Sequence, residues 1–406
     1  MQVSLLLKYK RFAIGLFFGA LFSLRIVQGF ASYPDFRTLD YTTYPDEVFY
    51  AIKIHYFALT GHLLSPLALS DSIPVILFGT LNRYVSIDLL YIFAPIAFIP
   101  ILYVVLCRLF DELGHPGISG IGAICVLVLG YYRPLWNDLA GTFGGYYGRF
   151  PETMFTAIFF FYALIIIHRR KHLVILGAMV GMMSYMYIYY GIFLIAFILV
   201  LRMWRSAMIA LIMCAPIIYM SKHAPGWVRD ISGVGYPVET SVYIWITILT
   251  AIGAICMWKG HGFIGKGILV GTVLEIVMFP VLPQTDHFRI VITQSLAVIA
   301  LVVLLSRQIN QKVVRIALIL FLLQVLVVAQ LNFYTRYYHQ TTLNDSIYND
   351  VNVMLYGNTT LEVYPSILLR NSPDEIITHY NLNQSEINKS YIYVYHYKQR
   401  NEGGDK

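Results

Sequence analysis

Eleven separate stretches of this chain are apolar enough to form membrane-spanning helices, and this constrains its fold more than any other feature. Only 13% of the 406 residues are charged, whereas roughly 25% is usual in soluble domains. The expected spans are residues 11–29, 89–108, 117–132, 153–168, 173–186, 188–201, 206–220, 241–257, 267–280, 289–305 and 315–332. We therefore expect an all-α polytopic membrane protein whose transmembrane domain covers residues 1–332.

The basic residues outside these stretches fall on one side of the membrane when the spans alternate. They lie in "KYKR" near the N-terminus and in the loops 168–172, 202–205, 259–266 and 307–312. Cytoplasmic loops of membrane proteins are enriched in Lys and Arg, so we expect these loops and the N-terminus to be cytoplasmic. The formal net charge of +7 then reflects membrane topology, and we expect no nucleic-acid partner.

An odd number of spans places the tail, residues 333–406, outside the cell membrane. Four glycosylation sequons support this, and they begin at Asn344, Asn358, Asn383 and Asn388. The alternating run "YIYVYHY" at 391–397 predicts a strand. We expect a small external α+β domain there.

The four cysteines all fall inside apolar runs and are expected to be buried core residues. Their spacing matches neither a metal site nor a disulfide framework. The first apolar run could be a signal peptide, but it is long and shows no clear cleavage site, so we expect an uncleaved first span.

The first external loop, residues 30–88, contains adjacent acids at Asp46 and Glu47. The following segments 47–64 and 72–85 have helical periodicity with an apolar face, so we expect helices lying flat at the membrane surface. Asp46 is a candidate general base or metal ligand there, because partial burial near lipid raises the pKa of a carboxyl group. The alternative is that the acids cap the helix that follows.

The second external loop reads "YYRPLWNDLAGTFGGYYGRFPETM". Irregular backbone at membrane depth is tolerated where it lines a cavity. Asp138 and Glu152 are candidates to face such a cavity, and Arg149 is a candidate phosphate ligand. The alternative is a solvated loop in which Pro151 begins the next helix.

Two later external loops add candidates. The loop 221–240 carries Lys222 and Glu239 and is either a substrate flap or a plain connector. In "DHFR", His287 and Arg289 stand at the start of a span, where the helix dipole disfavours a cation. Arg289 therefore either binds an anion such as a lipid phosphate or extends to the headgroups.

The order of these features resembles the GT-C glycosyltransferases, polytopic enzymes that use polyprenyl-phosphate sugars. The resemblance covers about residues 1–330 and is closest over 40–200. "PDEVFYAIKIHYFALTGHLLSP" resembles the family's first external loop, and "DHFR" is similar to its lipid-phosphate-binding segment. "NDLAGTFGGYY" is similar to a loop of oligosaccharyltransferase catalytic subunits, and there is a more distant likeness to protein mannosyltransferases.

Two oligosaccharyltransferase motifs are missing. The Asp-x-Asp/Glu metal pair is reduced to one acid, Glu152, and the Trp-Trp-Asp-Tyr-Gly acceptor motif does not occur. The resemblance therefore implies transfer of a single sugar from a polyprenyl monophosphate, such as dolichyl phosphate, and not of a whole glycan. A divalent metal is possible, and no other cofactor is expected.

The resemblance implies an inverting transfer to a hydroxyl of a lipid, glycan or glycoprotein acceptor on the outer face. Asp46 would be the base, with Glu47 as its partner. The donor phosphate would contact Arg289, Arg149, Lys222 and His287. The acceptor or sugar would contact Asp138, Glu152, Tyr50, Trp136, Tyr146, Tyr147 and Glu239.

Two other functions fit the sequence. Glu275, an acid inside an apolar run, and Pro-interrupted spans are typical of a lipid or solute transporter or flippase. Transporters often contain inverted repeats, and none is evident in this sequence. The chain could also be a non-catalytic GT-C homologue within a membrane complex.

Overall fold

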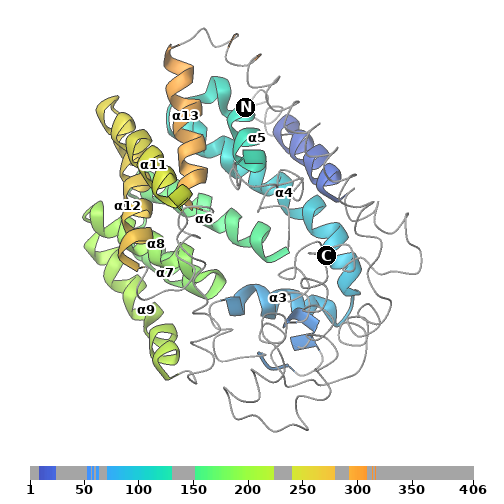
Figure 1. Ribbon diagram of the computed structural model, residues 1–406. Helices are drawn as coiled ribbons and strands as arrows, with labels where there is room; N and C mark the ends of the chain where they lie inside the picture. Colours follow the sequence, from blue (N-terminus) through green and yellow to red (C-terminus); the bar gives the residue numbers. More distant parts are fainter. Residues whose placement is uncertain are drawn as a thin grey trace, which may run out of the picture.

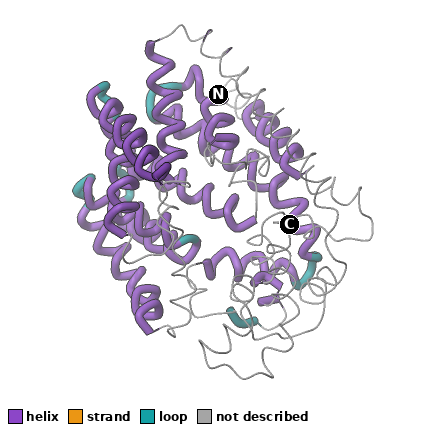
Figure 2. Tube along the Cα trace, in the orientation of Figure 1, coloured by secondary structure: helices purple, strands orange, loops and turns teal. Residues whose placement is uncertain are grey.

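The computed structural model describes residues 9–23, 53–55, 57–58, 61–63, 71–129, 151–223, 240–278 and 292–308, with the single positions 313 and 316. Within these ranges every regular element is a helix and there is no strand, as Figure 2 shows. The first helix covers residues 9–23. The others are α3 (Ser72–Asn82), α4 (Ile87–Glu112), a 3-10 turn (Pro116–Ile118), α5 (Ser119–Leu129), α6 (Pro151–Arg169), α7 (Leu173–Met186), α8 (Ile188–Val200), α9 (Trp204–His223), α11 (Thr240–Trp258), α12 (Gly262–Met278) and α13 (Gln294–Gln308).

Most of the expected spans in these ranges are confirmed as helices, with shifted ends. α7 and α8 match within a residue, whereas α4 is longer than expected and contains Pro95 and Pro100. The eleventh span at 315–332 is almost entirely outside the described residues. The tail, with its predicted strand at 391–397, lies wholly outside them.

Within the described residues, two helical segments, Leu89–Glu112 and Glu152–Arg169, are long and apolar enough to cross a membrane. Seven further apolar helices are shorter: Ser72–Asn82, Pro116–Leu127, Leu173–Met186, Ile188–Val200, Trp204–Ile217, Tyr243–Trp258 and Gln294–Ser306. Large apolar side chains such as Phe93 and Ile212 remain 56% and 68% exposed, as expected on a surface that meets lipid. These features support a membrane location. The number of spans and their orientation stay predictions.

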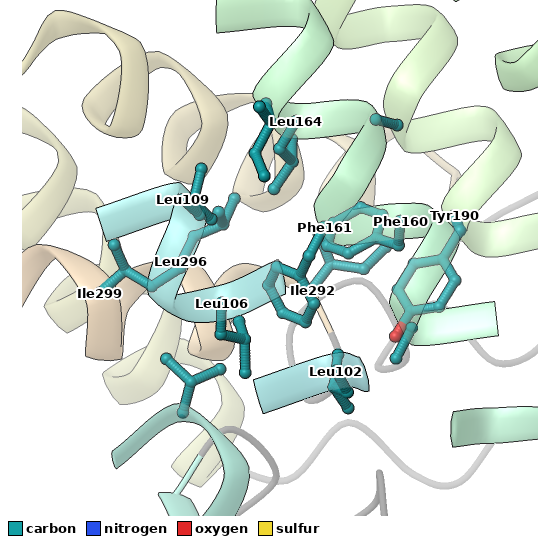
Figure 3. Packing of buried hydrophobic residues seen from close by; sticks show 14 of the residues in the cluster. Leu102, Leu106, Leu109, Phe160, Phe161, Leu164, Tyr190, Ile292, Leu296 and Ile299 are labelled. Atoms are coloured by element: carbon teal, nitrogen blue, oxygen red, sulfur yellow. The ribbon is translucent and has the colours of Figure 1, made fainter. Parts of the chain in front are cut away.

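The helices form a bundle around α4 and α6, as Figure 1 shows. Leucines of α4 meet aromatic residues of α6, and α8 and α13 complete this core (Figure 3). Phe160 of α6 stacks on Tyr190 of α8 with ring centroids 4.3 Å apart. Beside this core, Gly177 lets α7 approach α9, because a Cβ there would lie 2.7 Å from the carbonyl oxygen of Ser206. Small residues at such a seam are typical of helix packing in membranes.

Loops expected to be cytoplasmic meet at one end of the bundle, which we call the basic end. It comprises the last turns of α4, α6, α8 and α11 and the turns that follow them. Arg11 donates to Asp111 at 2.6 Å, and Arg169 donates to Glu112. Ion pairs thus connect the N-terminal helix with α4, and α4 with α6.

Two further contacts connect the turn after α4 with the turn after α11 and with the end of α13. The rings of His115 and His261 lie 5.7 Å apart, and Ser306 Oγ is 3.1 Å from His115 Nδ1. These loops are distant in the chain, so their meeting agrees with spans that alternate in direction.

The opposite end, which we call the Lys53 end, holds α3 and the first turn of α6. Glu152 and Arg169 mark the two ends of α6, and 17 residues at 1.5 Å each separate them by about 26 Å. This separation is close to the thickness of a bilayer core, roughly 30 Å.

α3 confirms the helix expected within 72–85, but its exposed face is not polar. Val75 and Phe78 are buried, and Ile76 and Leu81 on the other face are each 42% exposed. A helix that is apolar on both faces contacts its neighbours on one side and leaves the other for lipid.

Candidate functional site

A buried ion pair lies at the Lys53 end. Lys53 Nζ donates to Asp71 Oδ2 at 2.5 Å, and the two residues are 9% and 5% exposed. Asp71 stands at the N-cap position of α3, yet its side chain makes no capping hydrogen bond. Its carboxylate neutralises the buried ammonium group and is not used to cap the helix. Buried charges persist when they are paired in this way.

Glu152 is the third ionisable group of this cluster. It follows Pro151 in the first turn of α6, is 3% exposed, and has Asp71 and Lys53 as its charged neighbours. Pro151 therefore begins a helix, as one of our two alternatives expected. Glu152 is not solvated as that alternative required, because α6 places it in the interior of the bundle.

Three carboxyl oxygens of this cluster accept no hydrogen bond from any other described residue. They are Asp71 Oδ1, Glu152 Oε1 and Glu152 Oε2. A buried acceptor without a donor costs on the order of 1–3 kcal/mol, and more when it is charged. Such oxygens are suited to accept hydrogen bonds from the hydroxyl groups of a ligand.

Neighbouring contacts hold the segment that carries Lys53 against α3. Asn82 Nδ2 lies 3.1 Å from His55 Nδ1, and Arg83 Nε donates to the Ala58 carbonyl at 3.2 Å. Phe78 of α3 packs edge-on against Phe155 of α6 with ring centroids 6.1 Å apart. These contacts fix α3, α6 and the Lys53 segment relative to one another, and so fix the geometry of the charged cluster.

A metal site is not formed by the described residues alone. Among them, no group of three or more His, Cys, Asp or Glu side chains could hold a metal ion. The cluster offers two carboxylates, and the Lys53 ammonium already occupies one of them. A divalent metal would need ligands from residues that the structure does not describe.

Of the predicted site residues, the structure describes the side chain of Glu152 only. Lys222 was expected in a loop that begins at residue 221. This boundary is wrong, because α9 continues to His223. The remaining candidates lie outside the described residues: Asp46, Glu47, Tyr50, Trp136, Asp138, Tyr146, Tyr147, Arg149, Glu239, His287 and Arg289.

Sequence reasoning missed Lys53 and Asp71. Lys53 is the only Lys, Arg, Asp or Glu between residues 48 and 70, so a lone cation in an apolar run was a usable signal. Asp71, before "SIP", is typical of a helix cap and gave no such signal. The prediction that the cysteines are buried core residues is confirmed, since Cys107, Cys125, Cys214 and Cys256 are all buried and free.

Comparison with known proteins does not identify a family, because no family model and no curated protein matches the chain.

Proposed function

We propose that the chain is a membrane glycosyltransferase of the GT-C kind, which moves one sugar from a polyprenyl-phosphate donor to an acceptor hydroxyl. The observation that carries the proposal is the buried Glu152 carboxyl group, which accepts no hydrogen bond from any other described residue and interacts electrostatically with Lys53 and Asp71. The order of loops and spans in the sequence is the second support.

The site suits an acceptor that carries hydroxyl groups. Glu152 and Asp71 Oδ1 accept hydrogen bonds from acceptor hydroxyls and orient them. Lys53 holds Asp71 in place and keeps the net charge of the cluster at one negative unit when both acids are ionised.

In the proposed reaction the acceptor oxygen attacks the anomeric carbon of the donor sugar as Asp46 removes the hydroxyl proton. The bond between the anomeric carbon and the phosphate oxygen breaks, and polyprenyl phosphate leaves with both electrons. Attack opposite the leaving group inverts the configuration. Arg289, helped by Arg149, Lys222 and His287, stabilises the charge on the phosphate, an effect of roughly 3 kcal/mol for one well-placed donor.

The remaining candidates serve recognition. Glu47 orients Asp46, and Asp138 and Glu239 bind sugar hydroxyls. Tyr50, Trp136, Tyr146 and Tyr147 offer ring faces on which sugars stack.

The test compares Glu152→Gln with the wild type in lipid nanodiscs, with a fixed polyprenyl-phosphate sugar and increasing acceptor. Glutamine keeps the shape of the side chain but replaces one carboxyl oxygen by an amide and cannot ionise, so we expect a higher KM for the acceptor and little change for the donor. Glu275→Gln is the matched control, because Glu275 is equally buried, at 4% exposure, but is not among the charged neighbours of Glu152. Equal kinetics for wild type and Glu152→Gln would show that Glu152 does not contribute to acceptor binding.

Transport of a lipid or solute is the second candidate, favoured by the buried acid Glu275 within α12. Under this function, Glu275→Gln would abolish substrate movement across vesicles while no donor is consumed. A non-catalytic homologue would show neither activity.

A further inference from the structure

Three residues other than glycine have left-handed backbone conformations in the described part of the chain. They are Arg170 (φ 53°), His172 (φ 54°) and Arg202 (φ 60°). Asn, Asp and Gly are the usual residues at such angles, and other side chains pay a steric cost there. All three of these residues are basic side-chain types, and all three lie at the basic end.

Among the described residues, the backbone motif around Arg202 occurs three times at this end, and the other two copies use glycine. In each copy the helix ends with a hydrogen bond from a backbone N–H to the carbonyl oxygen five residues earlier. The bonds are Met203 N–H to Ile198 O (2.9 Å), His115 N–H to Phe110 O (2.9 Å) and His261 N–H to Cys256 O (2.8 Å). The left-handed positions are Arg202, Gly114 and Gly260. Glycine is the residue this motif favours, so an arginine at this position points to a use for its charge.

The turns that carry Arg170 and Arg202 lie side by side. Ser206 Oγ donates to the Leu173 carbonyl at 2.7 Å, which joins the start of α9 to the start of α7. Each of these two helix starts directly follows one of the turns.

The charges on these turns are exposed and are not neutralised by the described acids. Arg170, Lys171 and Arg202 are exposed and form no ion pair with a described residue. The acids of this end are engaged elsewhere, Asp111 with Arg11 and Glu112 with Arg108 and Arg169. Trp204, which follows Arg202 by two residues, is 61% exposed. A tryptophan beside unpaired cations is the composition found at the headgroup level of membranes.

We propose that the two turns, residues 169–172 and 201–205, bind the headgroups of anionic phospholipids. Arg170 and Arg202 offer planar guanidinium groups that match the oxygens of a phosphodiester, and Lys171 adds a point charge. Trp204 anchors the surface among the headgroups. This lipid site is separate from the proposed glycosyl transfer and does not depend on it.

The test measures lipid retention by full-length protein, purified in detergent and supplied with phosphatidylglycerol or phosphatidylcholine. Native mass spectrometry gives the bound lipids, and a thermal shift gives the stabilisation. We expect the wild type to prefer phosphatidylglycerol, and Arg170→Gly and Arg202→Gly each to lower that affinity about fivefold, the usual contribution of one basic residue. In phosphatidylcholine both glycine variants should have an unchanged or higher Tm, because the backbone strain is relieved.

Two controls separate this site from general charge effects. Arg202→Lys keeps the charge and should keep most of the preference. Lys10→Gln removes one exposed charge at the basic end outside the two turns and should leave the preference intact. The proposal is overturned if both glycine variants keep the wild-type preference, if Lys10→Gln loses as much, or if inorganic phosphate at the same concentration gives the same thermal shift.

Discussion

The buried cluster predicts that its two charge-removing variants differ in stability. Lys53→Met leaves Asp71 and Glu152 buried near each other without a cation. Asp71→Leu leaves Lys53 buried, but with Glu152 as a replacement partner. Breaking a buried pair costs roughly 3–5 kcal/mol when the remaining charge stays uncompensated. We therefore expect about that loss for Lys53→Met and clearly less for Asp71→Leu.

The double variant Lys53→Met/Asp71→Leu should recover most of the loss, because replacing a buried pair by apolar residues of similar volume is often neutral. Reversible unfolding in mixed micelles gives the free energy of unfolding for each variant and hence the coupling energy of the pair. The Arg169–Glu112 pair is the control, since its side chains are 38% and 20% exposed and its coupling should be below about 1 kcal/mol.

One result would refute this reasoning directly. If Asp71→Leu destabilises as strongly as Lys53→Met, Glu152 does not act as a second partner for Lys53. Adding Glu152→Gln to Asp71→Leu tests independently whether Glu152 pairs with Lys53 when Asp71 is absent. The added change should be strongly destabilising only if Glu152 had taken over the pairing.

Three further predictions concern packing. Gly177→Ala should destabilise the protein by roughly 1–3 kcal/mol, because the new Cβ would lie 2.7 Å from a backbone oxygen of α9. Gly262→Ala is the control and should be nearly neutral, since the nearest atom to its new Cβ would be 3.9 Å away. Phe160→Ala should cost about 3–5 kcal/mol by thermal or chemical unfolding, because it opens a cavity beside Tyr190, and an unchanged stability would contradict the stacking described above. The four buried cysteines should not react with maleimide in the folded protein and should all react after denaturation; rapid labelling of the native state would show that one is accessible.

The helices α7 and α8 were predictable because their signal is local. Basic residues at 168–172 precede α7 and those at 202–205 follow α8, so the charges mark the start of the first helix and the end of the second. α4 extends beyond its expected end at 108 because Asp111 and Glu112 pair with Arg11 and Arg169, which lets the helix continue through polar residues. Those partners come from distant parts of the chain, and no local sequence pattern predicts them.

The candidate site also depends on contacts between distant segments, which the sequence does not reveal. Glu152 was identified from its place beside a predicted span. Its neighbours Lys53 and Asp71 come from segments 99 and 81 residues earlier, and only the tertiary fold brings the three together. Asp71 in particular has the sequence signature of a helix cap, and the fold uses it as a buried counter-ion.

The most direct test of the proposed function is the release of free polyprenyl phosphate by purified protein in lipid. Wild type, Asp46→Asn and Glu152→Gln would be supplied with a panel of polyprenyl-phosphate sugars and a membrane extract as acceptor, and mass spectrometry would follow the product. We predict acceptor-dependent release by the wild type, loss in Asp46→Asn, and partial activity in Glu152→Gln that rises with acceptor concentration. No release by the wild type with any donor would contradict glycosyl transfer.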